Sequence, residues 1–227
     1  DTFEVTEAEL LRATPIILQR CREWTQQLLE CAGSAVDSAV DLLLRDKRFT
    51  LPAAAPAVLF LRSDACTASA ADGSQSPPGI GGNLGGAVWS LQLSHEQSLL
   101  PIAVLEFVAA VVTLVLFAAD VPTGALILFE VDALATVDAL TDDAANSPLM
   151  QHVHRWLLDR EEYRRLAPTL ICAHVFGDAN LLSDAASRSR WDVVHSFCSQ
   201  MGLAFEQRAA PSFAVALLNA LVDLSRS

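Results

Sequence analysis

Basic residues are scarce in this chain, and its middle holds none of them. There are 15 Lys and Arg against 27 Asp and Glu, and the formal net charge is −12. No Lys or Arg occurs between Ser63 and His154. Such an acidic protein repels the phosphate backbone, which excludes non-specific binding to nucleic acid. Any contact with phosphates must come from the few arginines elsewhere in the chain.

Paired cysteines of the metal-binding kind are also missing. The 5 cysteines are odd in number and contain no C-x-x-C pair. This pattern indicates a reducing, intracellular compartment and no structural zinc site. The first residues, DTFEVTEAEL, lack the basic and apolar regions of a signal peptide. A cleaved presequence, such as one that directs a protein to an organelle, would not be visible in this chain.

What the chain does contain is a long apolar run over residues 99–119, LLPIAVLEFVAAVVTLVLFAA. Its length is sufficient to cross a bilayer. However, Glu106 lies near its centre, where a charge costs roughly 2.5–3.5 kcal/mol, and no basic residue flanks either end. We therefore expect the buried helix of an α/β domain and no membrane partner. On this helix Glu106 shares its face with small residues, which allow close packing against a sheet: Ala103, Ala109, Ala110 and Thr113.

The chain divides into three predicted parts. Residues 1–50 read as a helical extension, in which Thr6 and Glu9 form a capping box. Residues 51–205 form the main domain and begin with the linker LPAAAP. Residues 206–227 form a C-terminal tail with an amphipathic helix. A hydrophobic content of 52% fits a large core or surfaces that a partner covers.

The main domain alternates between strand patterns and helix patterns, which predicts an α/β fold. Strands are expected over 57–66, 87–93, 125–131 and 169–175, and helices over 99–119, 132–140, 147–166 and 180–201. The glycines at 79, 81, 82, 85 and 86 fit neither phosphate-loop spacing and precede a strand. They are therefore predicted to form a turn.

Four acidic residues lie at positions in this pattern of strands and helices where a functional site could form. Asp64 and Asp132 come at the ends of strands, Glu106 lies in the apolar helix, and Asp184 opens the last long helix. Taken singly, three of them have ordinary interpretations as strand-end, cap or first-turn acids. Glu106 does not, because a carboxylate in an apolar helix needs a partner or a metal ion.

With these residues in place, the chain resembles the ribonuclease H domain of retroelements, in particular those joined to a reverse transcriptase. The resemblance covers about residues 57–205. It is carried by LFLRSDA (59–65), GGAVW (85–89), LEFVA (105–109), LFEVDALATV (128–137) and HVFGDANLLSDAASR (174–188). The last segment looks like the family's His-x-x-Gly-x-x-Asn-x-x-Ala-Asp-x-x-Ser-Arg signature. The implied fold is a ribonuclease H-like mixed sheet of about five strands flanked by helices, and residues 1–50 would be similar to the helical connection to the polymerase.

The resemblance also implies a function, that of a two-metal endoribonuclease. Asp64, Glu106, Asp132 and Asp184 would be the catalytic residues and would hold two Mg²⁺ ions, or Mn²⁺. The substrate would be the RNA strand of an RNA–DNA hybrid, recognised by its 2′-hydroxyl groups. A reverse transcriptase domain or other protein subunits are the expected partners of such a retrotransposon-derived hydrolase.

The remaining expectations concern the substrate and a proton shuttle. Arg155, Arg188 and Arg190 are the candidate substrate-binding residues, and His152 and His154 are the candidate shuttles. The chain departs from the family where Ala133 follows Asp132, since the family usually has asparagine there. Together with the scarcity of basic residues, this keeps an alternative open. In that alternative the fold is non-catalytic and serves as a structural or interaction subunit of a larger assembly.

Overall fold

The computed structural model describes residues 58–226, apart from 68–76, 142–144 and 176–178. The elements described below belong to one compact unit, which begins at Ala54. The helical extension predicted over residues 1–50 lies outside the described residues, and so does the linker at 51–56. Both stay predictions.

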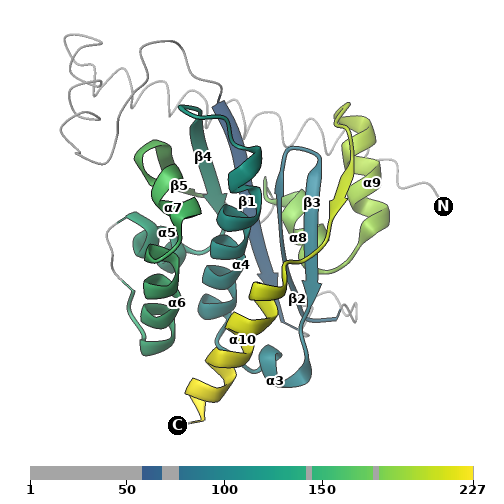
Figure 1. The fold of residues 1–227 in the computed structure, drawn as a ribbon. Helices are drawn as coiled ribbons and strands as arrows, with labels where there is room; N and C mark the ends of the chain where they lie inside the picture. Colours follow the sequence, from purple (N-terminus) through teal and green to yellow (C-terminus); the bar gives the residue numbers. More distant parts are fainter. Residues whose placement is uncertain (1–57, 68–76, 142–144, 176–178, 227) are drawn as a thin grey trace. The chain divides into compact units, whose positions relative to one another are not determined.

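Six strands form one mixed sheet in the order β5-β4-β1-β2-β3-β6 (Figure 1). Strands β1, β2 and β3 form an antiparallel meander, β4 and β5 run parallel to β1, and β6 runs parallel to β3. Their bounds are Val58–Cys66, Gly79–Leu84, Ala87–Gln92, Leu126–Val131, Leu170–His174 and Glu206–Arg208. The predicted mixed α/β sheet is confirmed, and β6 shows that the start of the predicted C-terminal tail belongs to it.

Helices cover both faces of this sheet (Figure 1). The central helix on one face is α4 (Ile102–Phe117), which packs on β1 and β2. Around α4 lie α3 (His95–Ser98), α5 (Leu134–Thr141), α6 (Pro148–Leu158), α7 (Glu161–Leu166) and α10 (Ser212–Ser225). On the opposite face α8 (Leu181–Ser187) packs on β1, β2 and β3, and α9 (Trp191–Gln200) packs against α8.

The long apolar segment forms the core helix that its composition predicts. Within the part of the chain that the structure describes, Ile102–Asp120 is long and apolar enough to cross a membrane, but 72% of it is buried inside the protein. Every residue from Val104 to Leu114 is buried. Burial on all sides of a helix is typical of the centre of a domain. The high hydropathy of α4 is therefore explained by its packing against the sheet and the surrounding helices.

The glycine-rich segment corrects the turn prediction in part. Gly79, Gly81 and Gly82 lie in strand β2, while Gly85 and Gly86 form the β2–β3 turn, where Gly85 has a φ of 54°. Glycine is needed in β2 because helices approach it from both sides. A Cβ on Gly81 would come within 3.0 Å of Ala186 in α8. A Cβ on Gly82 would collide with Thr113 Oγ1 in α4.

Replacing Gly82 with alanine should destabilise the domain by roughly 2–4 kcal/mol. The new Cβ would lie 2.7 Å from the Arg62 carbonyl oxygen and 2.9 Å from Trp89 Nε1. It would thus disrupt the buried 3.0 Å hydrogen bond from Trp89 to Thr113. Urea unfolding measures the loss. Gly85→Ala is the control, because no atom lies within 4 Å of that Cβ, and only backbone strain of about 1 kcal/mol is expected. Equal losses would contradict this packing account.

Two predicted helices are each divided in the structure. The helix expected over 147–166 is α6 followed by α7, with a break at Asp159 and Arg160. The helix expected over 180–201 is α8 followed by α9, with a break around Ser189, whose φ is 55°. A residue in the left-handed region ends an α-helix, so the chain turns sharply at this serine and α9 starts in a new direction.

Candidate active site

Two of the predicted acids follow neighbouring parallel strands. Asp64 lies near the carboxyl end of β1, and Asp132 directly follows β4. Ser63 is paired with Val131 in the parallel register, so the next residues, the two acids, come from matching positions. Adjacent strands lie about 4.8 Å apart. The β1–β4 pairing therefore brings these carboxylates to the same edge of the sheet.

Glu106 reaches the same place from α4. It is only 9% exposed, and it accepts a hydrogen bond from the backbone of Ala65, the residue after Asp64. Its Oε2 is buried without a hydrogen-bond partner among the described residues. A buried carboxylate oxygen that lacks a donor is costly. This oxygen is consequently the clearest candidate for an external ligand.

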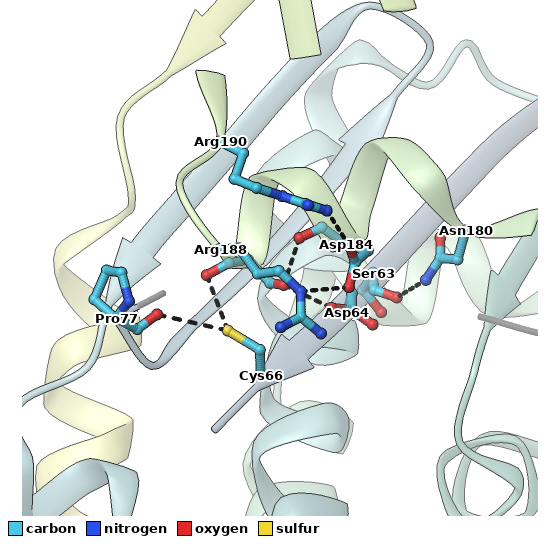
Figure 2. A network of polar contacts seen from close by, with 9 residues as sticks. Ser63, Asp64, Cys66, Pro77, Asn180, Asp184, Arg188 and Arg190 are labelled. Carbon is cyan, nitrogen blue, oxygen red and sulfur yellow. Dashed lines mark hydrogen bonds and ion pairs between the residues drawn. The ribbon is translucent and has the colours of Figure 1, made fainter. Parts of the chain in front are cut away.

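Asp184 approaches from α8, on the opposite face of the sheet from α4. Figure 2 shows its carboxylate held by two arginines that follow α8. Arg188 Nε donates to Oδ1 and Arg190 donates to Oδ2, both at 2.7 Å. Two of the three candidate substrate-binding arginines, Arg188 and Arg190, are therefore paired with one of the predicted acids.

Ser187 connects Asp64 to α8. Its hydroxyl oxygen lies 2.6 Å from Asp64 Oδ2 and 2.9 Å from the backbone oxygen of Asp184. A hydroxyl group has a single proton, so it cannot fully satisfy two acceptors. The hydroxyl donates to Asp64 Oδ2 or to the Asp184 carbonyl oxygen, and either contact holds Asp64 close to α8.

The pKa values of both buried acids are raised. Burial raises the pKa of Asp64 to about 7, the Ser187 hydrogen bond opposes this, and Asp184 and Asp132 raise it further. Burial also raises the pKa of Glu106 to about 9, with further increases from Asp64, Asp132 and Asp184. The pKa values of Asp64 and Glu106 are thus both affected by the charges of acids from other parts of the fold. The four acids form one electrostatic group, which we call the carboxylate cluster.

The carboxylate cluster is the candidate site for a divalent metal ion. Within the described ranges, no three His, Cys, Asp or Glu side chains are grouped closely enough to hold one. Protein contacts already occupy three of the acids: Asp64 pairs with Ser187, Asp132 with His174 and Asp184 with the arginines. The donors are nevertheless all carboxylate oxygens, which Mg²⁺ prefers. One of them, Glu106 Oε2, is buried and has no hydrogen-bond partner among the described residues. The residues fit a divalent ion if these contacts exchange.

The histidine that contacts the carboxylate cluster is His174. It lies in β5 as a strand residue, as the sequence predicts, and its Nε2 is 3.5 Å from Asp132 Oδ1. His154 is buried in α6 with its ring 6.3 Å from that of Phe107, and His152 is half-buried. Arg155 is exposed and lines a surface hollow of about 370 Å³ with Gln151. The roles predicted for His152, His154 and Arg155 stay predictions.

Contacts that sequence reasoning missed fix α8 against β1. The side chain of Asn180, which precedes α8 and is fully buried, donates to the Ser63 carbonyl at 2.8 Å. Arg62 donates to the Ala179 carbonyl and is itself held by Glu130 at 2.7 Å. Both contacts involve the two residues that precede Asp64 in β1, and they hold the start of α8 close to this strand. Asn180, Ser187 and His174 all belong to the segment 174–188, which was the available signal.

Comparisons with known proteins add a single structural likeness. No family model and no curated protein matches this chain. Among solved structures, the chain is similar to the RNase H1 of the halophilic archaeon Halobacterium salinarum NRC-1, with a TM-score of 0.44 and 16% sequence identity. The match covers 60% of this chain and 98% of the archaeal chain. We base the ribonuclease H-like fold class on the order of elements: a three-strand meander, a helix with Glu106, a strand before Asp132, further helices, a strand, and a helix with Asp184.

Proposed function

We propose that this chain is a divalent-metal-dependent hydrolase of the ribonuclease H type, which cleaves the RNA strand of RNA–DNA hybrids. The observation that carries the proposal is the carboxylate cluster. Four acids separated by up to 120 residues in sequence, Asp64, Glu106, Asp132 and Asp184, come from separate parts of the fold, and the charges of Asp132 and Asp184 raise the pKa of both Asp64 and Glu106. Folding gains nothing from gathering like charges, so the arrangement favours a catalytic use.

The chain's own residues suit this role. Two divalent ions in such a site activate a water molecule and stabilise the leaving oxygen of a phosphodiester. Asp64 and Glu106 would hold them after losing their protons, with Asp132 and Asp184 completing the set. His174 keeps the Asp132 carboxylate oriented, and Asn180 with Arg62 keeps α8 against β1. These contacts limit the movement of the acids while substrate binds.

The proposal extends to origin and partners. The sequence of residues 174–188 supports a retroelement origin, and the scarcity of basic residues supports a partner that holds the hybrid. With no Lys or Arg between Ser63 and His154, few groups on this chain bind phosphates. A reverse transcriptase domain or another basic subunit would provide the missing contacts.

The direct test is cleavage of a labelled RNA–DNA hybrid in Mg²⁺ or Mn²⁺, beside an all-DNA duplex of the same sequence. We expect metal-dependent cleavage of the RNA strand alone, reduced at least a hundredfold in Asp132→Asn, because a metal ligand is lost. Asp138→Asn is the control, since Asp138 is exposed on α5. Cleavage that is absent in both metals, or that is equal in the two variants, would contradict the proposal.

A second candidate is a non-catalytic subunit that keeps the fold. The observation that favours it is that no metal-binding group of three ligands is present in the described part of the chain. In addition, both carboxylate oxygens of Asp184 form ion pairs with arginines. The two candidates differ in one measurable property, because the subunit would neither bind divalent ions at the carboxylate cluster nor cleave the hybrid.

A further inference from the structure

The arginines after α8 have their charges engaged inside the protein. Each of the two carboxylate oxygens of Asp184 accepts a 2.7 Å ion-paired hydrogen bond, one from Arg188 and one from Arg190. Hydrogen bonds between two charged groups are among the strongest in proteins. A cation that approaches Asp184 therefore meets two positive charges that are already bound to its carboxylate.

The backbone holds both arginines in place. Ser189 has a φ of 55°, its N–H donates to the Ala186 carbonyl at 2.9 Å, and the Arg190 N–H donates to the Ala185 carbonyl at 2.8 Å. These two bonds are those of a Schellman motif, which ends a helix with a left-handed residue. The motif places Arg188 and Arg190 on either side of Ser189, and both side chains return to Asp184 (Figure 2).

Arg188 also acts on the rest of the carboxylate cluster. Its positive charge lowers the pKa of Asp64, against the larger effect of burial. Its side chain is 27% exposed, compared with 42% for Arg190. Charges that are less exposed to water are less screened, so Arg188 should have the greater influence on a cation in the cluster.

We propose that Arg188 and Arg190 form an internal counter-ion pair that competes with divalent cations for Asp184. In the protein without metal they neutralise Asp184 and engage both of its oxygens. A cation that fills the site then has to overcome the repulsion of both guanidinium groups or displace one of them. The arginine pair thereby sets the metal concentration at which the site fills. This inference depends on the proposed function insofar as the carboxylate cluster must bind a divalent ion.

The test is a calorimetric titration of Mn²⁺ into the parent protein, Arg188→Gln and Arg190→Gln. Each substitution frees an Asp184 oxygen and removes a positive charge from the cluster. We expect Arg188→Gln to bind Mn²⁺ on the order of tenfold more tightly than the parent, with a smaller gain for Arg190→Gln. The control is Arg208→Gln, which removes the same charge from an arginine paired with Asp120 and Glu206 and should bind Mn²⁺ as the parent does.

The outcomes separate this inference from the proposed function. Circular dichroism first confirms that each variant is folded. If the parent binds Mn²⁺ and neither arginine variant binds it more tightly, the counter-ion inference alone is overturned. It is also overturned if Arg208→Gln gains as much as Arg188→Gln, since the effect is then one of net charge. If no protein in the series binds Mn²⁺, both this inference and the proposed function are wrong.

Discussion

Asp64→Asn is expected to abolish hybrid cleavage while leaving the domain at least as stable at pH 8 as the parent. If Asp64 is a metal ligand as proposed, its loss would remove several kcal/mol of transition-state stabilisation, which is on the order of a thousandfold in rate. Stability is kept because Asp64 is 7% exposed and its pKa is raised to about 7. At pH 8 ionisation of the buried Asp64 carboxyl lowers the stability of the parent. The asparagine side chain of the variant stays neutral, and its oxygen still accepts a hydrogen bond from the Ser187 hydroxyl.

Cleavage assays and thermal unfolding at pH 8 measure the two effects on the same protein samples. Asp138→Asn is again the matched control, because it removes one negative charge from an exposed position on α5. A variant that lost activity together with several degrees of melting temperature would show that Asp64 has a structural role. Retained activity would remove Asp64 from the catalytic set.

In a metal-free buffer, the domain should lose stability as the pH rises from 5 to 9. Burial raises the folded-state pKa values of Asp64 and Glu106 to about 7 and about 9, from the ordinary values of 3.8 and 4.5. Between the unfolded and folded pKa values the native state holds more protons than the unfolded state, so unfolding becomes easier as protons are removed. The expected loss is roughly 3 °C of melting temperature per pH unit above pH 7, where Glu106 alone contributes, and about twice that below pH 7, where both groups contribute.

Glu106→Gln and added metal test the cause of this pH dependence. The glutamine variant cannot ionise at this position, so its melting temperature should fall less between pH 7 and 9 than that of the parent. Mn²⁺ at pH 8.5 should restore much of the parent's loss, because a bound cation replaces the missing protons. Identical pH profiles in parent and variant would refute the ionisation of Glu106 as the cause.

Three members of the carboxylate cluster could be singled out in the sequence because each is an acidic residue at the end of, or inside, an apolar segment. Asp64 and Asp132 follow apolar strands, and Glu106 is the one charge in an apolar helix. Parallel strands bring their carboxyl ends to one edge, so position in the chain implies position in space for such residues. The core helix α4 was predicted on other grounds, from a long apolar run with Glu106 near its centre and no basic residue at either end.

The contacts of the cluster were less accessible to sequence reasoning. The Ser187–Asp64 hydrogen bond joins residues 123 positions apart, and it depends on how closely α8 approaches β1. That approach depends in turn on Gly79 and Gly81 in β2, where a side chain would collide with α8. Strand β2 was missed because a strand is recognised by alternating apolar and polar side chains, and glycine has none. The break between α8 and α9 was missed for a similar reason, since Ser189 takes the left-handed conformation that glycine usually marks.

The most direct test of the account is a crystal of the protein soaked in Mn²⁺ and measured at the manganese absorption edge. We predict anomalous peaks among Asp64, Glu106, Asp132 and Asp184, with carboxylate oxygens about 2.2 Å from the metal and the ions about 4 Å apart if two are bound. Glu106 Oε2 should then be a ligand, and at least one arginine should have left Asp184. A fully loaded crystal with no peak among these four acids would contradict the account.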